Sequence, residues 1–225
     1  NNSQQEGTIT LNASSFEGEI YGASVKGELV NGAIDNRIAV GGLVGQDSTI
    51  GSASLKIVNS NAIVTIKDSL TVADTYRYSV GGILGSSSAC SNGIDESAYV
   101  SIVNSRASGS IDIAGSNAAV NGLHMRTFAG GIAGRVCLAT ASDNLKNDSS
   151  SVQINIRTKT GNSSVYGTVV FDTVAVGGLF GIVDNATQKP LSVSQVGYTG
   201  SITVADSLNS VLVGGIVGAY REASG

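Results

Sequence analysis

A short glycine-rich box occurs five times along the chain and constrains the fold more than any other feature. The copies are VGGLVG, VGGILG, AGGIAG, VGGLFG and VGGIVG, with first glycines at Gly41, Gly81, Gly130, Gly177 and Gly214. Glycine weakens helices and strands alike, so a recurring glycine pair marks a sharp bend or a close approach of two backbones. A period of 37 to 49 residues predicts a repeat architecture.

Two further segments recur between the boxes. The sequence IVNS occurs at Ile57 and Ile102, with a looser copy, TLNAS, at Thr10. The second segment reads GELV at Gly27, AIVTI at Ala62, GSIDI at Gly109, GTVVF at Gly167 and GSITV at Gly200. In both segments Val, Ile and Thr alternate with polar residues, which is typical of half-buried strands. Each unit therefore contains three strand-like segments in a fixed order, and no window has a sustained helical period.

This order predicts an all-β fold. We expect a single-stranded right-handed parallel β-solenoid (β-helix) of about five coils with three strands each. The right-handed sense follows from the usual handedness of parallel crossovers. One domain would cover residues 1–225, with units at approximately 7–45, 53–85, 98–134, 151–181 and 191–218. A β-sandwich is the alternative, but it gives no reason for a repeated glycine box.

Stacked coils would place equivalent residues about 4.8 Å apart. Two residues of every box would then form interior columns, namely Val40, Val80, Ala129, Val176 and Val213, and Leu43, Ile83, Ile132, Leu179 and Ile216. At one corner Asn12, Asn59 and Asn104 are expected to form an asparagine ladder. The polar segments after the boxes (Gln46–Ser54, Ser86–Ala98, Arg135–Ser151 and Ile182–Pro190) and the insertion from Ala114 to Phe128 are expected to be surface loops.

The composition favours an extracellular or cell-surface protein. Hydrophobic residues make up 41%, which excludes a chain disordered by composition. Charged residues make up 13%, about half the usual share, and Ser, Thr, Asn and Gly supply the polar surface. The net charge of -4 and the lack of a basic run argue against a nucleic-acid partner. No apolar run approaches the ~20 residues of a transmembrane segment. Because the chain starts at Asn1 without Met, we interpret it as a processed or excised segment.

The VGGLVG boxes, preceded by an NS-x-x-x-G-x-I element, resemble the GLUG repeat. That repeat occurs in bacterial IgA-cleaving surface proteases, outside the catalytic domain, and in large adhesin-like surface proteins. The resemblance covers five units and implies an extracellular, all-β, non-catalytic stalk or adhesive region. The chain departs from the pattern in its irregular spacing and in AGGIAG with its long insertion, and no part resembles a protease catalytic domain.

The sequence lacks the motifs of common catalytic and cofactor sites. The boxes match neither the GxGxxG of a Rossmann turn nor the GK-Ser/Thr of a P-loop. The acidic segments at Ile94 and Asp143 lack EF-hand spacing. His124 is the only histidine, which excludes a multi-histidine metal site. We therefore expect no catalytic, cofactor-binding or metal-binding residue and no cofactor, although 17 acidic residues leave a glycosidase-type carboxylate pair open.

The two cysteines each follow a glycine box, in successive units. Cys90 lies five residues after Gly85, and Cys137 lies three residues after Gly134. Adjacent coils would bring these positions to nearly the same corner, and the composition fits an oxidising compartment, so we predict a Cys90–Cys137 disulfide. The alternative is two separate thiols in loops that do not meet.

Two features of the sequence indicate contact with glycans. Asn-x-Ser/Thr occurs at Asn12, Asn147, Asn162 and Asn185, as well as at the first residue, and these four are candidate glycosylation sites if the source glycosylates its proteins. Tyr76 and Tyr78 are close enough to form a sugar-stacking face.

Two function classes remain. The first is an extracellular structural or adhesive repeat protein, whose partner is itself, in end-to-end filaments, or flanking repeats of a stalk. The second is a β-solenoid that binds or cleaves polysaccharide, with glycans or host surface ligands as partners.

Overall fold

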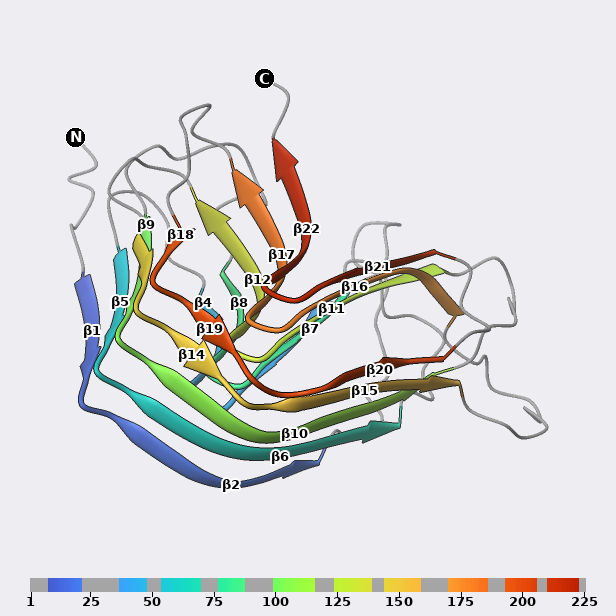
Figure 1. Cartoon of the computed structure of the whole chain (residues 1–225), viewed down its shortest axis with the longest axis horizontal. Coiled ribbons are helices and arrows are strands. Elements are labelled where there is room, and N and C mark those ends of the chain that lie inside the picture. Colours follow the sequence, from blue (N-terminus) through green and yellow to red (C-terminus); the bar gives the residue numbers. More distant parts are fainter. Residues whose placement is uncertain are drawn as a thin grey trace, which may run out of the picture.

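The computed structural model describes residues 8–21, 37–47, 54–69, 77–87, 99–115, 124–138, 144–158, 170–185, 193–205 and 210–222. These residues form 22 β-strands and no helix, so the prediction of an all-β fold is confirmed. The chain passes five times through four parallel sheets, which we call sheets A, B, C and D, and one pass is called a unit. All strand pairs within the sheets are parallel, as Figure 1 shows, and equivalent residues of successive units are paired, with one register shift between Met125 and Arg126.

Sheet A takes the first predicted segment, and sheet B takes the second one in the second, third and fifth units. In the first and fourth units the prediction for the second segment is wrong, because sheet B is built there from Ser15–Tyr21 and Gln153–Thr158. Val170 and Phe171 of GTVVF belong to sheet C, and GELV at Gly27 lies outside the described residues. Sheet A contains, in spatial order, β1 (Thr8–Asn12), β5 (Ser54–Val58), β9 (Tyr99–Val103), β13 (Asn144–Lys146) and β18 (Val193–Ser194). Sheet B contains β2 (Ser15–Tyr21), β6 (Asn61–Ser69), β10 (Arg106–Gly115), β14 (Ser149–Ser150) with β15 (Gln153–Thr158), and β19 (Gly197–Tyr198) with β20 (Ile202–Val204). The fourth unit thus begins at β13, before the start expected at residue 151.

Sheets C and D are both built from the glycine boxes and their flanks. Sheet C contains β3 (Arg37–Gly41), β7 (Arg77–Gly81), β11 (His124–Gly130), β16 (Val170–Gly177) and β21 (Val211–Gly214). Sheet D contains β4 (Val44–Asp47), β8 (Leu84–Ser87), β12 (Ala133–Leu138), β17 (Phe180–Asn185) and β22 (Val217–Glu222). A unit therefore has four strand positions, and the expectation of three strands per coil is wrong.

The glycine pair explains this difference, because it splits each box into two strands. In the first unit β3 ends at Gly41 and β4 begins at Val44, so the chain bends at Gly42 and Leu43. A Cβ atom on Gly42 would lie 2.4 Å from the carbonyl oxygen of Gly82 and 2.7 Å from Cγ1 of Val64. Only glycine fits such a corner, where the bend of one unit touches the backbone of the next.

The core lies between two bent layers. In Figure 1 sheet A continues into sheet B along the left and lower edge, while sheet C runs back above sheet B and sheet D turns up beside sheet A. The interior columns predicted from the boxes are confirmed in the inner units, where Val80, Ala129 and Val176, like Ile83, Ile132 and Leu179, are completely buried.

The corner between sheets A and B carries the asparagine ladder. Nδ2 of Asn59 donates to Oδ1 of Asn12 over 3.2 Å, and Nδ2 of Asn104 donates to Oδ1 of Asn59 over 2.7 Å, so the predicted ladder is confirmed. The backbone at this corner is left-handed in all five units, at Ala13, Asn59, Asn104, Asn147 and Gln195 (φ 49° to 59°). Asparagine tolerates this conformation better than most residues, which accounts for its recurrence.

Several segments expected to be surface loops are strands. The first residues of each polar sequence after a box belong to sheet D, where Ser86, Arg135, Asp184 and Asn185 are buried. The insertion from Ala114 to Phe128 is shorter than expected, since β10 runs to Gly115 and β11 starts at His124. The part of the chain that the structure describes contains no helix of the length and hydrophobicity needed to cross a membrane.

Candidate functional site: the two open ends of the stack

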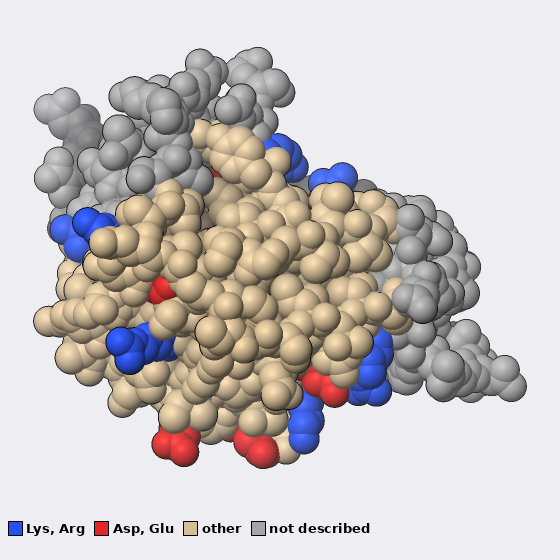
Figure 2. Space-filling model, in the orientation of Figure 1, with Lys and Arg blue, Asp and Glu red and all other residues tan. Residues whose placement is uncertain are grey.

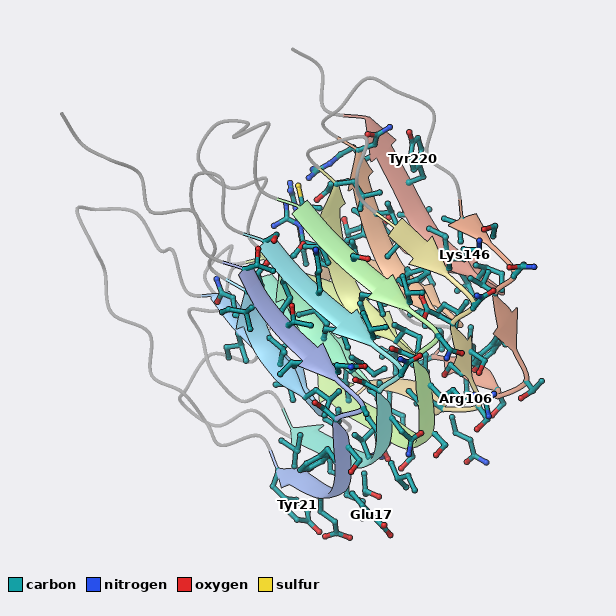
Figure 3. The ribbon with its side chains drawn as sticks, turned by 90° about the vertical axis from the view of Figure 1, so that its left-hand side faces the viewer. Glu17, Tyr21, Arg106, Lys146 and Tyr220 are labelled. Atoms are coloured by element: carbon teal, nitrogen blue, oxygen red, sulfur yellow. The ribbon has the colours of Figure 1, made fainter. Side chains whose placement is uncertain are left out.

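The first and the last unit expose apolar side chains, most of them at positions that the inner units bury. The exposed large hydrophobic residues are Ile9 (57%), Tyr21 (62%), Ile63 (42%), Leu212 (45%), Val213 (53%) and Tyr220 (50%). All but Ile63 lie in the first or the last unit. Figure 3 shows Tyr21 at one end of the stack and Tyr220 at the other. Apolar surface of this kind marks an interaction site more often than a free face.

Both ends also leave strand edges unpaired among the described residues. In every sheet the strand of the first unit forms one edge and the strand of the last unit forms the opposite edge. Unpaired parallel edges offer rows of N–H and C=O groups to another chain, so they are templates for further pairing. The two ends together are the candidate interaction site.

A buried polar column runs inside the corner between sheets A and B. The backbone N–H of Ser60 donates to Oγ of Ser105 over 3.4 Å, and the N–H of Ser105 donates to Oδ1 of Asp148 over 2.9 Å. Ser14 begins the column, because its N–H donates to Oγ of Ser60 over 3.3 Å. The column links four units, and the asparagine ladder lies beside it on the surface.

Asp148 is the charged member of this column. Burial raises the pKa of Asp148 from 3.8 to about 7, and the backbone hydrogen bonds from Ser105 and Lys146 offset only part of this effect. Its Oδ2 atom is buried and has no hydrogen-bond partner. A carboxyl group in such a site is stable in its neutral form, so its ionisation opposes folding as the pH rises.

Sheet D contains a buried ion-pair ladder. Nε of Arg135 donates to Oδ2 of Asp184 over 2.7 Å, and Nε of Arg221 donates to Oδ1 of the same carboxylate over 2.8 Å. The side chains of Arg135 and Asp184 are 4% and 3% exposed, whereas that of Arg221 is 52% exposed. The ladder spans the third, fourth and fifth units and tightens the inner part of the stack.

The outer face of sheet B is a polar surface. Alternate residues of its strands point to solvent, among them Glu17, Tyr21, Arg106 and an Arg157–Asp112 ion pair with 2.8 Å between Nε and Oδ1. Tyr21 donates a hydrogen bond to Glu19. Figure 2 looks onto one end of the stack, where most of the surface turned to the viewer carries no charge, and charged side chains gather along its lower edge, where Figure 1 places sheet B.

The structure describes only part of the predicted disulfide and none of its geometry. Cys137 lies in β12 and is completely buried, and its N–H donates to Oγ of Ser87 over 2.7 Å. No cysteine among the described residues is free. Cys90 lies outside the described residues, so the Cys90–Cys137 pairing stays a prediction.

The four candidate glycosylation sites have different surroundings. Asn12 and Asn147 are exposed at the corner between sheets A and B. Asn185 is not in a loop as expected: it lies in β17, is 2% exposed, and its Nδ2 donates to Oη of Tyr220 over 2.9 Å. Asn162 lies outside the described residues.

Other expected site residues are also placed differently. Tyr78 is completely buried in the core, so it does not share an outward face with Tyr76, which lies outside the described residues. His124 starts β11 and is not part of a loop. Within the described ranges no group of three or more His, Cys, Asp or Glu side chains could hold a metal ion.

Sequence reasoning missed the buried polar groups. The serine column had a signal, because Ser14, Ser60 and Ser105 all follow the left-handed corner residue. Asp148 replaces serine at this position in the fourth unit and conceals the match. No sequence pattern indicates the Arg135–Asp184 ion pair. Arg135 directly follows the last glycine of its box, Gly134, whereas two residues separate Asp184 from Gly181.

Comparisons with protein-family models, with curated proteins and with solved structures found no match to this chain.

Proposed function

We propose that the chain is an extracellular structural or adhesive repeat module, built as a right-handed parallel β-solenoid, that works by stacking. Its ends would contact flanking repeats in a stalk or further copies in a filament. In this function the chain carries no catalytic residue and no cofactor. The observation that carries the proposal is the register of five units through four sheets, combined with two apolar ends.

The chemistry of the described residues supports this proposal. The stack is held by apolar columns, backbone ladders, asparagine and serine columns and a buried ion pair, all of which continue from unit to unit. Strands pair only between neighbouring units among the described residues, which is the property of solenoids that lets them extend as stalks. The resemblance of the boxes to GLUG repeats of surface proteins points to the same location, at the cell surface or outside the cell.

The location and the role can be tested on the source cells. An antibody raised against the purified chain should label intact cells, and protease added outside should remove the label. Labelling that requires permeabilised cells would contradict an extracellular module. Far-UV circular dichroism of the purified chain should show less than about a fifth helix, below the base rate of about a third.

A polysaccharide-binding or polysaccharide-cleaving solenoid is the second candidate, and the outer face of sheet B favours it. Tyr21 is 62% exposed there beside Glu17 and Glu19, and an exposed aromatic ring next to carboxylates is a common way to hold a sugar. A glycan array tests binding, and release of reducing sugar tests cleavage. Binding that is lost in Tyr21→Ala would favour this candidate, whereas a blank array would leave the structural module.

A further inference from the structure

We infer that the partner of each open end is the opposite end of a second copy, stacked head to tail so that the last unit of one chain continues into the first unit of the next. This inference rests on the proposed structural function. It assigns a register to the contact, in which the bend at Gly215 receives Phe16 of the second copy.

The contact between the fourth and fifth units is the template for this assignment. In each inner contact the second glycine of a box faces a sheet B residue of the following unit. The facing pairs are Gly42 with Ala62, Gly82 with Ala107, Gly131 with Ser150 and Gly178 with Tyr198. A Cβ atom on Gly215 in the last unit would meet nothing within 4 Å, so this bend is open.

Phe16 occupies the matching position at the other end. The strand registers place Phe16, Ala62, Ala107, Ser150 and Tyr198 in one column. Small residues fill the three inner positions, and aromatic rings fill the first and the last. A glycine follows two residues later in both end units, at Gly18 and Gly200, and the aromatic ring lies against it in both. Phe16 and Tyr198 therefore have similar surroundings within their own units. They differ in that Tyr198 also packs against the glycine bend of the preceding unit, at Gly178, whereas Phe16 has no such unit beside it.

The backbone groups at the two ends are complementary. At each inner bend three N–H groups donate to the next unit, for example Gly42 to Gly82 over 3.1 Å and Leu43 and Val44 to Ile83 over 3.0 Å. At the last bend the N–H groups of Gly215 and Ile216 have no partner among the described residues, and neither do the carbonyl groups of Gly42 and Leu43 at the first bend. One end thus offers donors where the other end offers acceptors.

The corner between sheets A and B gives an independent match. There the N–H of the left-handed residue donates to the next unit, as Asn147 does to the carbonyl oxygen of Ser194 over 3.1 Å. The pattern leaves Gln195 as a donor at the last unit. In the return direction the N–H of Gly197 donates to the backbone carbonyl oxygen of Asp148 over 3.0 Å. The matching N–H of the first unit, that of Ser15, has no partner among the described residues. Both corners therefore specify the same register of stacking.

A contact between opposite ends of identical chains does not close, so it produces a fibre. Five units with a spacing of about 4.8 Å predict an axial rise of about 24 Å per chain. An axial rise of this size is expected only if the strands of one copy continue directly from those of the next. Association through the sides of the stack would give a different repeat distance.

Gly215→Val tests the inference. The monomer has open space at Gly215 and no left-handed backbone, so the variant should fold normally, whereas the added side chain would meet Phe16 in the stack. Gly197→Val is the matched control: it also lies in the last unit with open space, but on the outer face of sheet B. Sedimentation and electron microscopy of the purified chains measure fibre formation by each variant at protein concentrations from about 1 µM to about 1 mM, the range of moderate to weak dissociation constants.

We expect fibres with a rise of about 24 Å from the wild type and Gly197→Val, and a critical concentration at least about tenfold higher for Gly215→Val. A wild-type chain that stays monomeric would overturn the inference, and so would fibres that form equally well with Gly215→Val. If Gly215→Val fails to fold, Val213→Lys replaces it, since Val213 is 53% exposed in the monomer and would be covered in the stack. Monomers that keep a strand-rich circular dichroism spectrum would leave the structural module standing without self-assembly.

Discussion

Val176 and Val213 occupy the same position of the same glycine box, yet Val176 is completely buried and Val213 is 53% exposed. The two residues differ only in their neighbours, because Val176 lies in the fourth unit and Val213 in the last. Ile9 in the first unit and Leu55 in the second differ in the same way, with exposures of 57% and 2%. A unit of this chain therefore does not complete its own core.

The comparison shows where the stability of the stack comes from. At about 25 cal/mol per Å² of buried apolar surface, a side chain gains its full stabilisation only when a unit lies on both sides of it. The inner units gain this burial together with the ladders, while the end units gain half of it. Stability should thus be sensitive to changes in the inner units and tolerant at the ends, and the expectations below are ordered by the size of that contrast.

The largest contrast is expected between Gly131→Val and Gly215→Val. A Cβ atom on Gly131 would lie 2.1 Å from Oγ of Ser150 and 2.3 Å from the carbonyl oxygen of Gly178. A backbone carbonyl cannot move aside, so we expect a loss above the usual overpacking cost of about 1–3 kcal/mol, or no folded protein. Gly215→Val should leave the melting temperature of the monomer unchanged.

Thermal unfolding at low protein concentration measures both variants. Equal melting temperatures would contradict a tightly packed inner bend. Ser87→Val is unsuitable as a tolerant control, although the sequence places Ser87 in a polar segment. The structure buries it completely, and its Oγ atom accepts the N–H of Cys137.

The ion-pair ladder of sheet D gives the second contrast, within one set of contacts. Asp184→Ala would leave Arg135 charged and 4% exposed, which typically costs about 3–5 kcal/mol. Arg221→Ala removes the outer partner, whose side chain is 52% exposed, and should cost at most about 1 kcal/mol. Urea unfolding of the two variants measures this difference, and equal losses would show that the inner pair is not the dominant one.

The buried carboxyl group of Asp148 predicts that the stability of the inner units depends on pH. Its pKa is raised from 3.8 to about 7, so the folded state holds the proton more tightly than the unfolded state. The stabilisation by the neutral carboxyl group is complete below pH 4 and is lost as the pH rises through 7. At about 1.4 kcal/mol for each tenfold difference in proton affinity, this loss amounts to at most about 4 kcal/mol.

Asp148→Ser should remove this dependence, because serine fills the same position in the second and third units and accepts the same backbone N–H. We expect the variant to gain stability over the wild type between pH 4 and 7 and to keep the gain above 7. Other carboxylates titrate in both proteins and cancel in the difference. Parallel stability profiles, measured by denaturant unfolding at several pH values, would contradict the role of Asp148.

The inner columns could be predicted from the sequence because they depend on periodicity. Val80 and Ile83 recur with the box, and alternation of apolar residues identifies the strands on either side. The number of sheets could not be predicted, since a glycine pair inside an apolar box is compatible with one strand or with two strands and a bend. Only the close contact between Gly42 and Gly82 decides for the bend.

The buried polar residues could not be predicted because hydrophobic patterns assign polar side chains to the surface. Arg135 and Asp184 are buried as a pair, and Asn185 is buried with its amide bonded to Tyr220. Burial of such groups is stable only when their partners are in place, and those partners are 35 to 49 residues away in the sequence. Their positions follow from the register, which the sequence specifies only approximately.

The predicted disulfide would strengthen the inner part of the stack, since Cys90 follows the second unit and Cys137 lies in the third. A Cys90–Cys137 bond would contribute about 2–4 kcal/mol by restraining the unfolded chain. Peptide mapping without reductant should recover the two cysteines in one linked peptide pair, and the melting temperature should fall after reduction. Recovery of two separate thiols from native material would contradict the bond.

The smallest contrast concerns the left-handed corner, where the first unit differs from the inner ones. Ala13 has a φ of 49°, and Asn59, Asn104 and Asn147 take its place in the next three units. The left-handed conformation costs an ordinary residue about 1–2 kcal/mol, and less for asparagine, whose side chain bonds locally. Ala13→Asn should therefore stabilise the chain by up to about 1 kcal/mol, and Asn104→Ala should destabilise it by more, because it also removes the bond to Asn59. Denaturant unfolding of both variants decides the point. If Asn104→Ala cost no more than Ala13→Asn gains, the backbone conformation alone would explain the asparagines, and the ladder between side chains would add nothing to the inner units.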